Sequence, residues 1–269
     1  MLTFAWATES DERGLQAFTQ CGLTINDKGS MLTKTEAIVL RSFKYGDNKL
    51  ITDLFTRSGG RLSFVATVSA RGKLKKQYFQ PLSLLEVEYD MRPKLQLQKL
   101  TAASISVAFA DIPFNPTKLS ISLFLAEFMC RALNGERQGE PLFSYIADSL
   151  QWLDGSKTGI ANFHLVFLMR LTRFLGFFPN LDNYSDGDFF NLRSGCFCIQ
   201  KPLHNDCLTP DDARRMTTLM RMNYHNMHLF RLSRDERNRL LDVALRYYEI
   251  HLPDFPQLKS VDVLREMSV

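Results

Sequence analysis

The chain has 269 residues, 45% of them hydrophobic and 23% charged, which is enough to bury more than one small core. No apolar run reaches the roughly 18 residues of a membrane-spanning helix, and the first residues lack the basic and apolar pattern of a secretory signal. The five cysteines are an odd number for a chain of this length, which argues against a disulfide framework and for a reducing cytoplasm.

The net charge of +4 is unevenly distributed along the chain. Residues 31–100 hold 13 Lys and Arg against 6 Asp and Glu. Residues 1–30 hold 2 against 4, and residues 101–269 hold 18 against 19. A local positive field is what a polyanion-binding surface requires, although a basic domain that is merely soluble would show the same excess.

The first 30 residues differ from the rest of the chain. They are polar and weakly acidic, and they show no sustained period. Met31 stands directly before the first strong strand pattern. We therefore expect residues 1–30 to be an extension that is not part of the fold.

Between residues 34 and 105 the sequence has the period of β-strands. Alternating or β-branched segments predict strands at residues 35–40, 50–56, 62–68, 82–89 and 95–105. Gly59 and Gly60 predict a tight hairpin, because paired glycines accept positive φ without a steric penalty. Five short strands fit a small closed barrel, and the commonest five-stranded one is the OB-fold. We predict such a domain over residues 31–112.

After Pro113 and Pro116 the pattern changes to that of helices. Helices are predicted at residues 118–133, 141–152, 160–176, from 210, at 234–251 and from about 258. Thr117, Thr209 and Ser233 are the predicted N-caps of three of them. The fold class is therefore α+β, with a five-stranded OB-fold barrel followed by a mainly α-helical domain over residues 113–269, which contains an irregular insertion near 179–208.

The basic residues of the barrel region are the candidates for DNA contacts, because phosphates require Lys and Arg on one face. The predicted DNA-binding residues are Arg41, Lys44, Lys49, Arg57, Arg61, Arg71, Lys73, Lys75, Lys76, Arg92 and Lys94. Each of them alone is better explained as a solvated surface residue. The loop 71–76 is not, because four cations in six residues repel one another unless a polyanion is near. Phe43, Tyr78 and Phe79 could stack on bases or pack in the barrel core.

No motif for catalysis is present. The sequence lacks a glycine-rich phosphate loop, His-Glu-x-x-His and Gly-x-Ser-x-Gly, so we predict no enzymatic activity and no cofactor. His225 and His228 are best explained as surface or capping residues. Cys196, Cys198, His204 and Cys207 could in principle form a tetrahedral zinc site, but the one-residue gap in Cys-x-Cys is unusual for structural zinc. We therefore predict no metal.

The order of motifs in the barrel region resembles the RecO family. The matching elements are Ala37-Ile38-Val39-Leu40, Tyr45-Gly46-Asp47, Leu54-Phe55-Thr56, Gly60-Arg61-Leu62, the basic loop 71–76 before Gln80-Pro81-Leu82, and Leu258-Lys259-Ser260. The resemblance covers residues 31–269, strongly in the barrel and more loosely in the helical part. Many members of the family carry a zinc module with two Cys-x-x-Cys pairs. Here the place of the first pair reads Asp182-Asn183-Tyr184-Ser185, so the module is expected to be lost.

The resemblance implies a cytoplasmic, nucleoid-associated mediator of DNA repair and homologous recombination. Such a protein binds single- and double-stranded DNA, anneals complementary strands and helps to load the RecA recombinase on DNA coated by the single-strand-binding protein. It also implies RecR and the acidic C-terminal tail of the single-strand-binding protein as partners, with no membrane. For that tail we predict a cationic rim at Arg131, Arg170 and Arg173. The alternative is an interaction adaptor in a repair complex that does not itself bind DNA.

Overall fold

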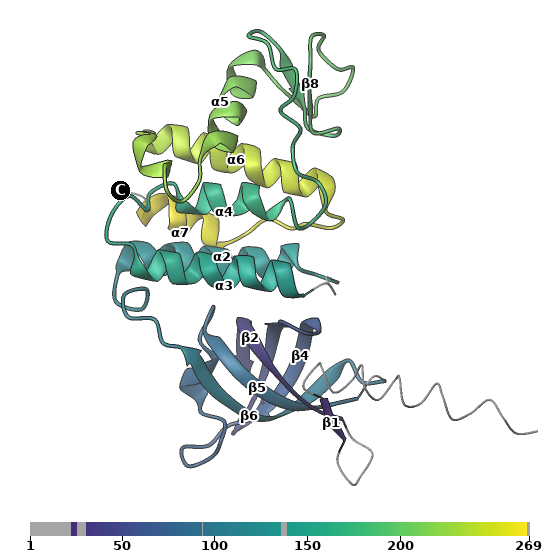
Figure 1. Cartoon of the computed structure of the whole chain (residues 1–269), viewed down its shortest axis with the longest axis vertical. Coiled ribbons are helices and arrows are strands. Elements are labelled where there is room, and N and C mark those ends of the chain that lie inside the picture. Colours follow the sequence, from purple (N-terminus) through teal and green to yellow (C-terminus); the bar gives the residue numbers. More distant parts are fainter. Residues whose placement is uncertain (1–22, 26–30, 93, 136–138, 268–269) are drawn as a thin grey trace, which may run out of the picture. The chain divides into compact units, whose positions relative to one another are not determined.

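The computed structural model describes residues 23–25, 31–92, 94–135 and 139–267 (Figure 1). These residues form two compact units. The barrel unit contains the described residues up to Ala108 together with those of Leu133–Ala147. The helical unit contains Phe109–Ala132 and the described residues from Asp148 onward. The segment Leu133–Ala147 thus belongs with the barrel, whereas we expected a single boundary after residue 112.

The barrel is a closed sheet of five strands. They are β2 (Met31–Lys44), β3 (Lys49–Thr56), β4 (Gly60–Thr67), β5 (Leu84–Met91) and β6 (Leu97–Val107). Their order is β2-β3-β4-β6-β5, and pairing of β5 with β2 closes the ring. Only the β4–β6 pair is parallel among the five. This arrangement confirms the predicted OB-fold barrel, which removes the open sheet edges that would otherwise promote aggregation.

The expectation for residues 1–30 falls mostly on residues outside the described part of the chain. Three of these residues are described, and they form the short strand β1 (Leu23–Ile25), which pairs antiparallel with β2. For these three residues the expected separation from the fold therefore does not hold.

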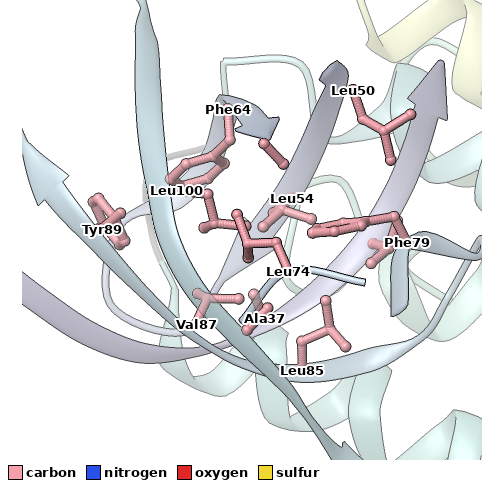
Figure 2. Close-up of a cluster of buried hydrophobic side chains, with 13 residues drawn as sticks. Ala37, Leu50, Leu54, Phe64, Leu74, Phe79, Leu85, Val87, Tyr89 and Leu100 are labelled. Atoms are coloured by element: carbon pink, nitrogen blue, oxygen red, sulfur yellow. The ribbon is translucent and has the colours of Figure 1, made fainter. Parts of the chain in front are cut away.

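The barrel core is built from the inward-facing side chains of all five strands (Figure 2). Phe64 and Tyr89 are almost completely buried and pack edge to face, with their ring centroids 5.0 Å apart. Leu74 and Phe79 come from the connection between β4 and β5, which contains the 3-10 helix η1 (Lys76–Phe79), and both are buried in the same cluster. Burial of each large apolar side chain contributes about 1.5–3 kcal/mol, so the connection is fixed to the barrel by its own side chains.

A register shift in β2 between Val39 and Arg41 changes which side chains face outward. Before the shift, the odd-numbered Thr35 and Ala37 are buried. After it, the odd-numbered Arg41 and Phe43 are exposed. Because side chains alternate along a strand, one extra residue in one strand is enough to reverse the two sides.

The helical unit is assembled from elements that follow the barrel in the sequence. The bounds of its helices are α2 (Pro116–Ala132), α3 (Glu140–Gly155, whose first half lies in the barrel unit), α4 (Phe163–Leu171), α5 (Pro210–Arg221), the 3-10 helix η2 (Met227–Leu229), α6 (Arg234–His251) and α7 (Ser260–Met267). Phe128 of α2 packs edge to face on Tyr248 of α6, at 4.8 Å between ring centroids. Both rings are completely buried, so this pair lies in the core of the unit. Across the described residues, no helix has the length and apolar character needed to cross a membrane.

Two of the three predicted N-caps are confirmed. The Thr209 side chain accepts from the Asp212 N–H, and Ser233 and Glu236 form a reciprocal capping box. The prediction for Thr117 is wrong, because Asn115 Oδ1 accepts from the N–H groups of Thr117 and Lys118. An asparagine preceding a proline is also a favourable cap, and it starts the helix at Pro116.

The segment 179–208, which we expected to be irregular, contains a small sheet. Its strands are β7 (Phe189–Asn191), β8 (Cys196–Cys198) and β9 (Cys207–Leu208), in the order β8-β7-β9. Phe197 packs against Tyr184 at 4.7 Å and against Phe190 at 5.0 Å between ring centroids. Aromatic packing thus provides a core for this module.

Candidate nucleic-acid interface

Four strands of the barrel present one continuous surface outward. The strand register aligns Arg41 with Asp53, Ser63 and Leu97 in one row, and Phe43 with Ile51, Val65 and Lys99 in the next. Lys49 and Thr67 are paired beyond these rows. We call these ten residues the outer barrel face. Directly opposite residues on a sheet are about 5 Å apart at Cβ, so the charged and apolar side chains of this face lie within the reach of one nucleotide chain.

Asp53 organises the basic residues at the centre of the outer barrel face. Its carboxylate accepts from Arg41 Nε at 2.6 Å, Arg61 Nη2 at 3.0 Å and Ser63 Oγ at 2.6 Å. Burial by itself would raise the pKa of Asp53, but the hydrogen bonds from Ser63, Arg41 and Arg61 outweigh burial and hold that pKa below its usual range. The Arg41 side chain stays 50% exposed, whereas that of Arg61 is only 15% exposed. Arg41 is therefore fixed in place but still open to a ligand.

Exposed rings lie among these cations. Phe43 is 46% exposed, and Tyr45 in the turn that follows β2 is 59% exposed. The Arg41 guanidinium carbon lies 5.8 Å from the centroid of the Phe43 ring. Of the three aromatic residues for which stacking and burial were both open, Phe43 is exposed and Phe79 is buried. Tyr78 packs partly against the core, with Lys75 Nζ 5.9 Å from its ring centroid.

The basic loop begins at the same end of the barrel as the β2–β3 turn. The Val68 N–H donates to Asn48 O at 2.8 Å, and buried Leu74 anchors the far end of the loop. Lys75 and Lys76 line a shallow pocket of about 520 Å³ together with residues 68–70. The exposed predicted cations at this end are Lys44, Lys49, Arg71, Lys73, Lys75 and Lys76. No ion pair with another described residue engages any of these six.

The opposite side of the barrel is acidic. Glu86, Glu88 and Asp90 alternate along β5 with the buried core residues, and Glu86 forms an ion pair with Lys34 at 3.1 Å. Asp90 is the strand partner of Lys99, so it lies at the border with the outer barrel face, whereas Glu86 and Glu88 lie away from it. Lys73 lines a pocket with Glu86 and Glu88, so it lies toward this acidic side rather than the outer barrel face. The separation of charge gives the barrel one side that attracts a polyanion and one that repels it.

Arg57 lies at the other end of β3 and is occupied by contacts within the barrel unit. Its Nε is 2.7 Å from Glu36 Oε2, and its Nη1 donates to Ser144 Oγ at 3.0 Å. The guanidinium carbon lies 4.6 Å from the Phe143 ring centroid. The structure therefore separates Arg57 from the exposed cations and places it where it joins α3 to the barrel.

Arg92 and Lys94 are exposed in the turn between β5 and β6. The buried Gln98 side chain holds this turn: Oε1 accepts from the Arg92 N–H at 2.9 Å, and Nε2 donates to Arg92 O at 3.0 Å. Exposed Lys99, two residues after Leu97, was missed by the sequence prediction. Strand alternation, which puts Lys99 on the side opposite Gln98 and Leu100, would have been the signal.

The three arginines predicted to form a rim in the helical unit make separate contacts. Arg131 is exposed in the last turn of α2. Arg170 Nη2 donates to Met222 O at 3.2 Å, and the Arg173 guanidinium carbon lies 4.1 Å from the Phe178 ring centroid. The helix expected over 160–176 ends at Leu171, so Arg170 and Arg173 do not share a helix face.

The four residues of the zinc alternative are not arranged as a metal site. Cys196 and Cys207 pair with Asn191 from opposite sides of β7. His204 Nδ1 accepts from the Asp206 N–H at 3.2 Å, and burial raises the pKa of the Cys198 thiol, with smaller contributions from Cys207 and Asp188. Within the part of the chain that the structure describes, no three His, Cys, Asp or Glu side chains are placed to hold a metal ion.

Comparisons with known proteins identify the family of this chain. Residues 31–109 match the model for the N-terminal part of recombination protein O, and residues 113–261 match the model for its C-terminal part. The chain is 48% identical over 239 residues to the DNA repair protein RecO of Phocaeicola vulgatus, covering 88% of this chain and 99% of that protein. It is 49% identical over 240 residues to the DNA repair protein RecO of Bacteroides fragilis, with the same coverage, and 34% identical over 240 residues to that of Porphyromonas gingivalis, covering 87% and 98%. The chain therefore belongs to the RecO family, and its role lies in DNA repair and recombination.

Proposed function

We propose that this protein is a non-catalytic recombination mediator that binds single- and double-stranded DNA through the outer barrel face, the adjoining Lys44 and the loop 68–76. The observation that carries the proposal is the placement of Lys99 in the same strand row as the exposed ring of Phe43, with Arg41 and Lys49 in the two adjoining rows. Cations that follow a phosphate backbone and rings that stack on bases are together the pattern of single-strand binding.

Duplex binding uses only part of this surface. A paired helix offers phosphates but keeps its bases stacked, so the exposed cations act on it while Phe43 and Tyr45 do not. Glu86 and Glu88 of β5 favour an orientation in which the outer barrel face meets the DNA. Contacts to phosphates carry no sequence information, which suits a protein that anneals complementary strands of any sequence.

The wider role follows from membership of the family. In the proposed pathway the protein anneals strands and helps RecA to replace the single-strand-binding protein, with RecR as a second partner. The acidic tail of the single-strand-binding protein binds the helical unit in the region of Arg131, Arg170 and Arg173. Exposed Arg131 and Arg173 are compatible with such a contact. No step of this function requires a cofactor.

The test compares two exposed lysine changes on opposite sides of the barrel. Lys44→Ala/Lys49→Ala should weaken binding of a labelled oligonucleotide about tenfold in fluorescence anisotropy, which is about 1.4 kcal/mol. The slope of log affinity against log salt should fall by about 0.7 for each cation lost on single strands. Lys34→Ala, on the acidic side, is the control and should change neither quantity. If the wild-type protein binds no DNA, the adaptor hypothesis replaces this one.

A further inference from the structure

The helical unit is nearly neutral overall, but one stretch of it contains no acidic residue. Residues 213–234 hold five arginines and no Asp or Glu. Arg214 and Arg215 form ion pairs with Asp186 and Asp212, at 2.7 and 2.8 Å. Arg221 and Arg231 are exposed, and neither makes an ion pair with any residue in the described ranges. Two cations are thus left available to an external anion at the ends of one loop.

That loop, between α5 and α6, is held in a fixed shape. The buried Asn162 side chain donates to Met227 O at 3.1 Å and to Phe230 O at 2.8 Å. Asn223 Oδ1 accepts from the N–H groups of His225 and Asn226, at 2.9 Å each. A loop that is already ordered loses little conformational entropy when it binds a ligand.

An open pocket with aromatic walls lies beside the same loop. Its volume is about 550 Å³, and its lining residues are Trp152, Thr158, Gly159, Tyr224, His225 and His228. The rings of Trp152 and Tyr224 are half-buried and nearly parallel, with centroids 5.2 Å apart. Tyr224 Oη donates to Ser149 Oγ at 2.9 Å, which fixes the orientation of its ring.

The connection between α3 and α4 comes close to the loop from the other side. A Cβ on Gly159 would lie only 2.8 Å from His228 Cβ, so this glycine permits a close approach of the two segments. Lys157, two residues earlier, is exposed and adds a third cation next to the pocket. We call Trp152, Lys157, Arg221, Tyr224, His225, His228 and Arg231 the helical-unit patch.

We propose that the helical-unit patch binds a second single strand of nucleic acid, with phosphates at Arg221, Arg231 and Lys157 and a base against Trp152 and Tyr224. Basic side chains around half-exposed rings are the arrangement that single strands require. The inference rests on the proposed function, because annealing needs two strands held by one chain. The barrel takes one strand and the patch takes the other.

Intrinsic fluorescence tests the patch by itself. The chain has two tryptophans, Trp6 and Trp152, so in a Trp6→Phe protein all tryptophan emission comes from the pocket. Titration with an oligo-dT strand should quench this emission in a saturable way. Arg221→Ala/Arg231→Ala should raise the oligo-dT concentration needed for half-maximal quenching at least about fivefold, as expected for the loss of two phosphate contacts.

The control removes the same charge from arginines that are already paired. Arg193→Ala/Arg214→Ala lowers the net charge of the helical unit equally, but both side chains form ion pairs with carboxylates, so quenching should stay unchanged. Arg221→Lys/Arg231→Lys keeps the charge and should retain most of the quenching, which excludes misfolding as the cause of the loss. Annealing of complementary strands should be slower with Arg221→Ala/Arg231→Ala than with the control.

The barrel variant separates this inference from the proposed function. Lys44→Ala/Lys49→Ala should keep the Trp152 quenching while total binding in anisotropy falls. Absence of quenching, or quenching that is insensitive to Arg221→Ala/Arg231→Ala, overturns the patch. If anisotropy still shows binding that depends on Lys44 and Lys49, the proposed function stands without it. Absence of DNA binding in both measurements overturns both.

Discussion

Both units contain an aspartate that holds two arginines, but the two clusters lie in opposite environments. In the barrel, Asp53 binds Arg41 and Arg61, and its side chain is 2% exposed. In the helical unit, Asp206 binds Arg193 at 2.8 Å and Arg246 at 2.9 Å, and its side chain is 23% exposed. The barrel cluster fixes a cation within the proposed DNA-binding surface, whereas the helical cluster neutralises cations that face solvent. The net charge of a segment therefore predicts anion binding less well than the number of its cations that are exposed and not paired with a carboxylate.

The largest expected effect is the loss of the buried cluster. Asp53→Asn removes the charge that balances Arg61, which is mostly buried, and should lower the free energy of unfolding by about 2–3 kcal/mol. This is less than the ~3–5 kcal/mol of a fully buried pair, because Arg41 is half exposed. Urea denaturation measures the change. Asp206→Asn, the matched change in the exposed cluster, should leave the midpoint unchanged; equal losses in the two variants would contradict the comparison.

A smaller effect concerns Phe43, the aromatic residue of the outer barrel face. Phe43→Ala should weaken single-strand binding by about 1–2 kcal/mol, the cost of one stacked base, and leave duplex binding nearly unchanged. Ile105→Ala is the control, because Ile105 is also 46% exposed but lies on β6 outside the outer barrel face. Fluorescence anisotropy with single- and double-stranded oligonucleotides gives both affinities. An equal loss on the duplex would mean that Phe43 acts through the shape of the barrel rather than by stacking.

The smallest effect is on the pH dependence of stability. The pKa of Asp53 is lower in the folded protein than its ordinary value of 3.8, so the folded state binds protons less readily than the unfolded state. The resulting stabilisation is present above pH 3.8 and is lost as the pH falls through the lower folded pKa. The difference in unfolding free energy between wild type and Asp53→Asn should therefore shrink below that pH and stay constant at neutral pH. A difference that is the same at every pH would rule out the charge of Asp53 as its cause.

Much of the fold could be predicted because it depends on local patterns. Strand period, paired glycines and the caps at Thr209 and Ser233 each act over a few residues, and the structure confirms them. The third predicted helix was too long, because Thr172 Oγ1 donates to Met169 O and the chain turns before Gly176. The spacing of apolar residues in the sequence could not show that this helix ends at Leu171.

The candidate site was harder to predict because it depends on pairing between distant residues. The sequence showed Arg41, Arg57 and Arg61 as equivalent cations. Their environments differ because Asp53 and Glu36 are brought beside them by strand register across 8 to 21 residues. Arg221 and Arg231 were not predicted, because residues 101–269 are nearly neutral as a whole. The nearby acids Asp186 and Asp212 pair with Arg214 and Arg215 instead, which only the structure shows.

The register shift between Val39 and Arg41 determines how an insertion or deletion in β2 would affect the surface of the barrel. Before the shift the odd-numbered side chains of β2 face the core, and after it the odd-numbered side chains face outward. Deletion of Leu40, the extra residue, would straighten the strand and leave Arg41 and Phe43 facing outward, whereas deletion of Ser42 beyond the shift would turn Phe43 toward the barrel core. A one-residue insertion or deletion beyond the shift therefore changes which side chains face outward, and not only the length of the strand.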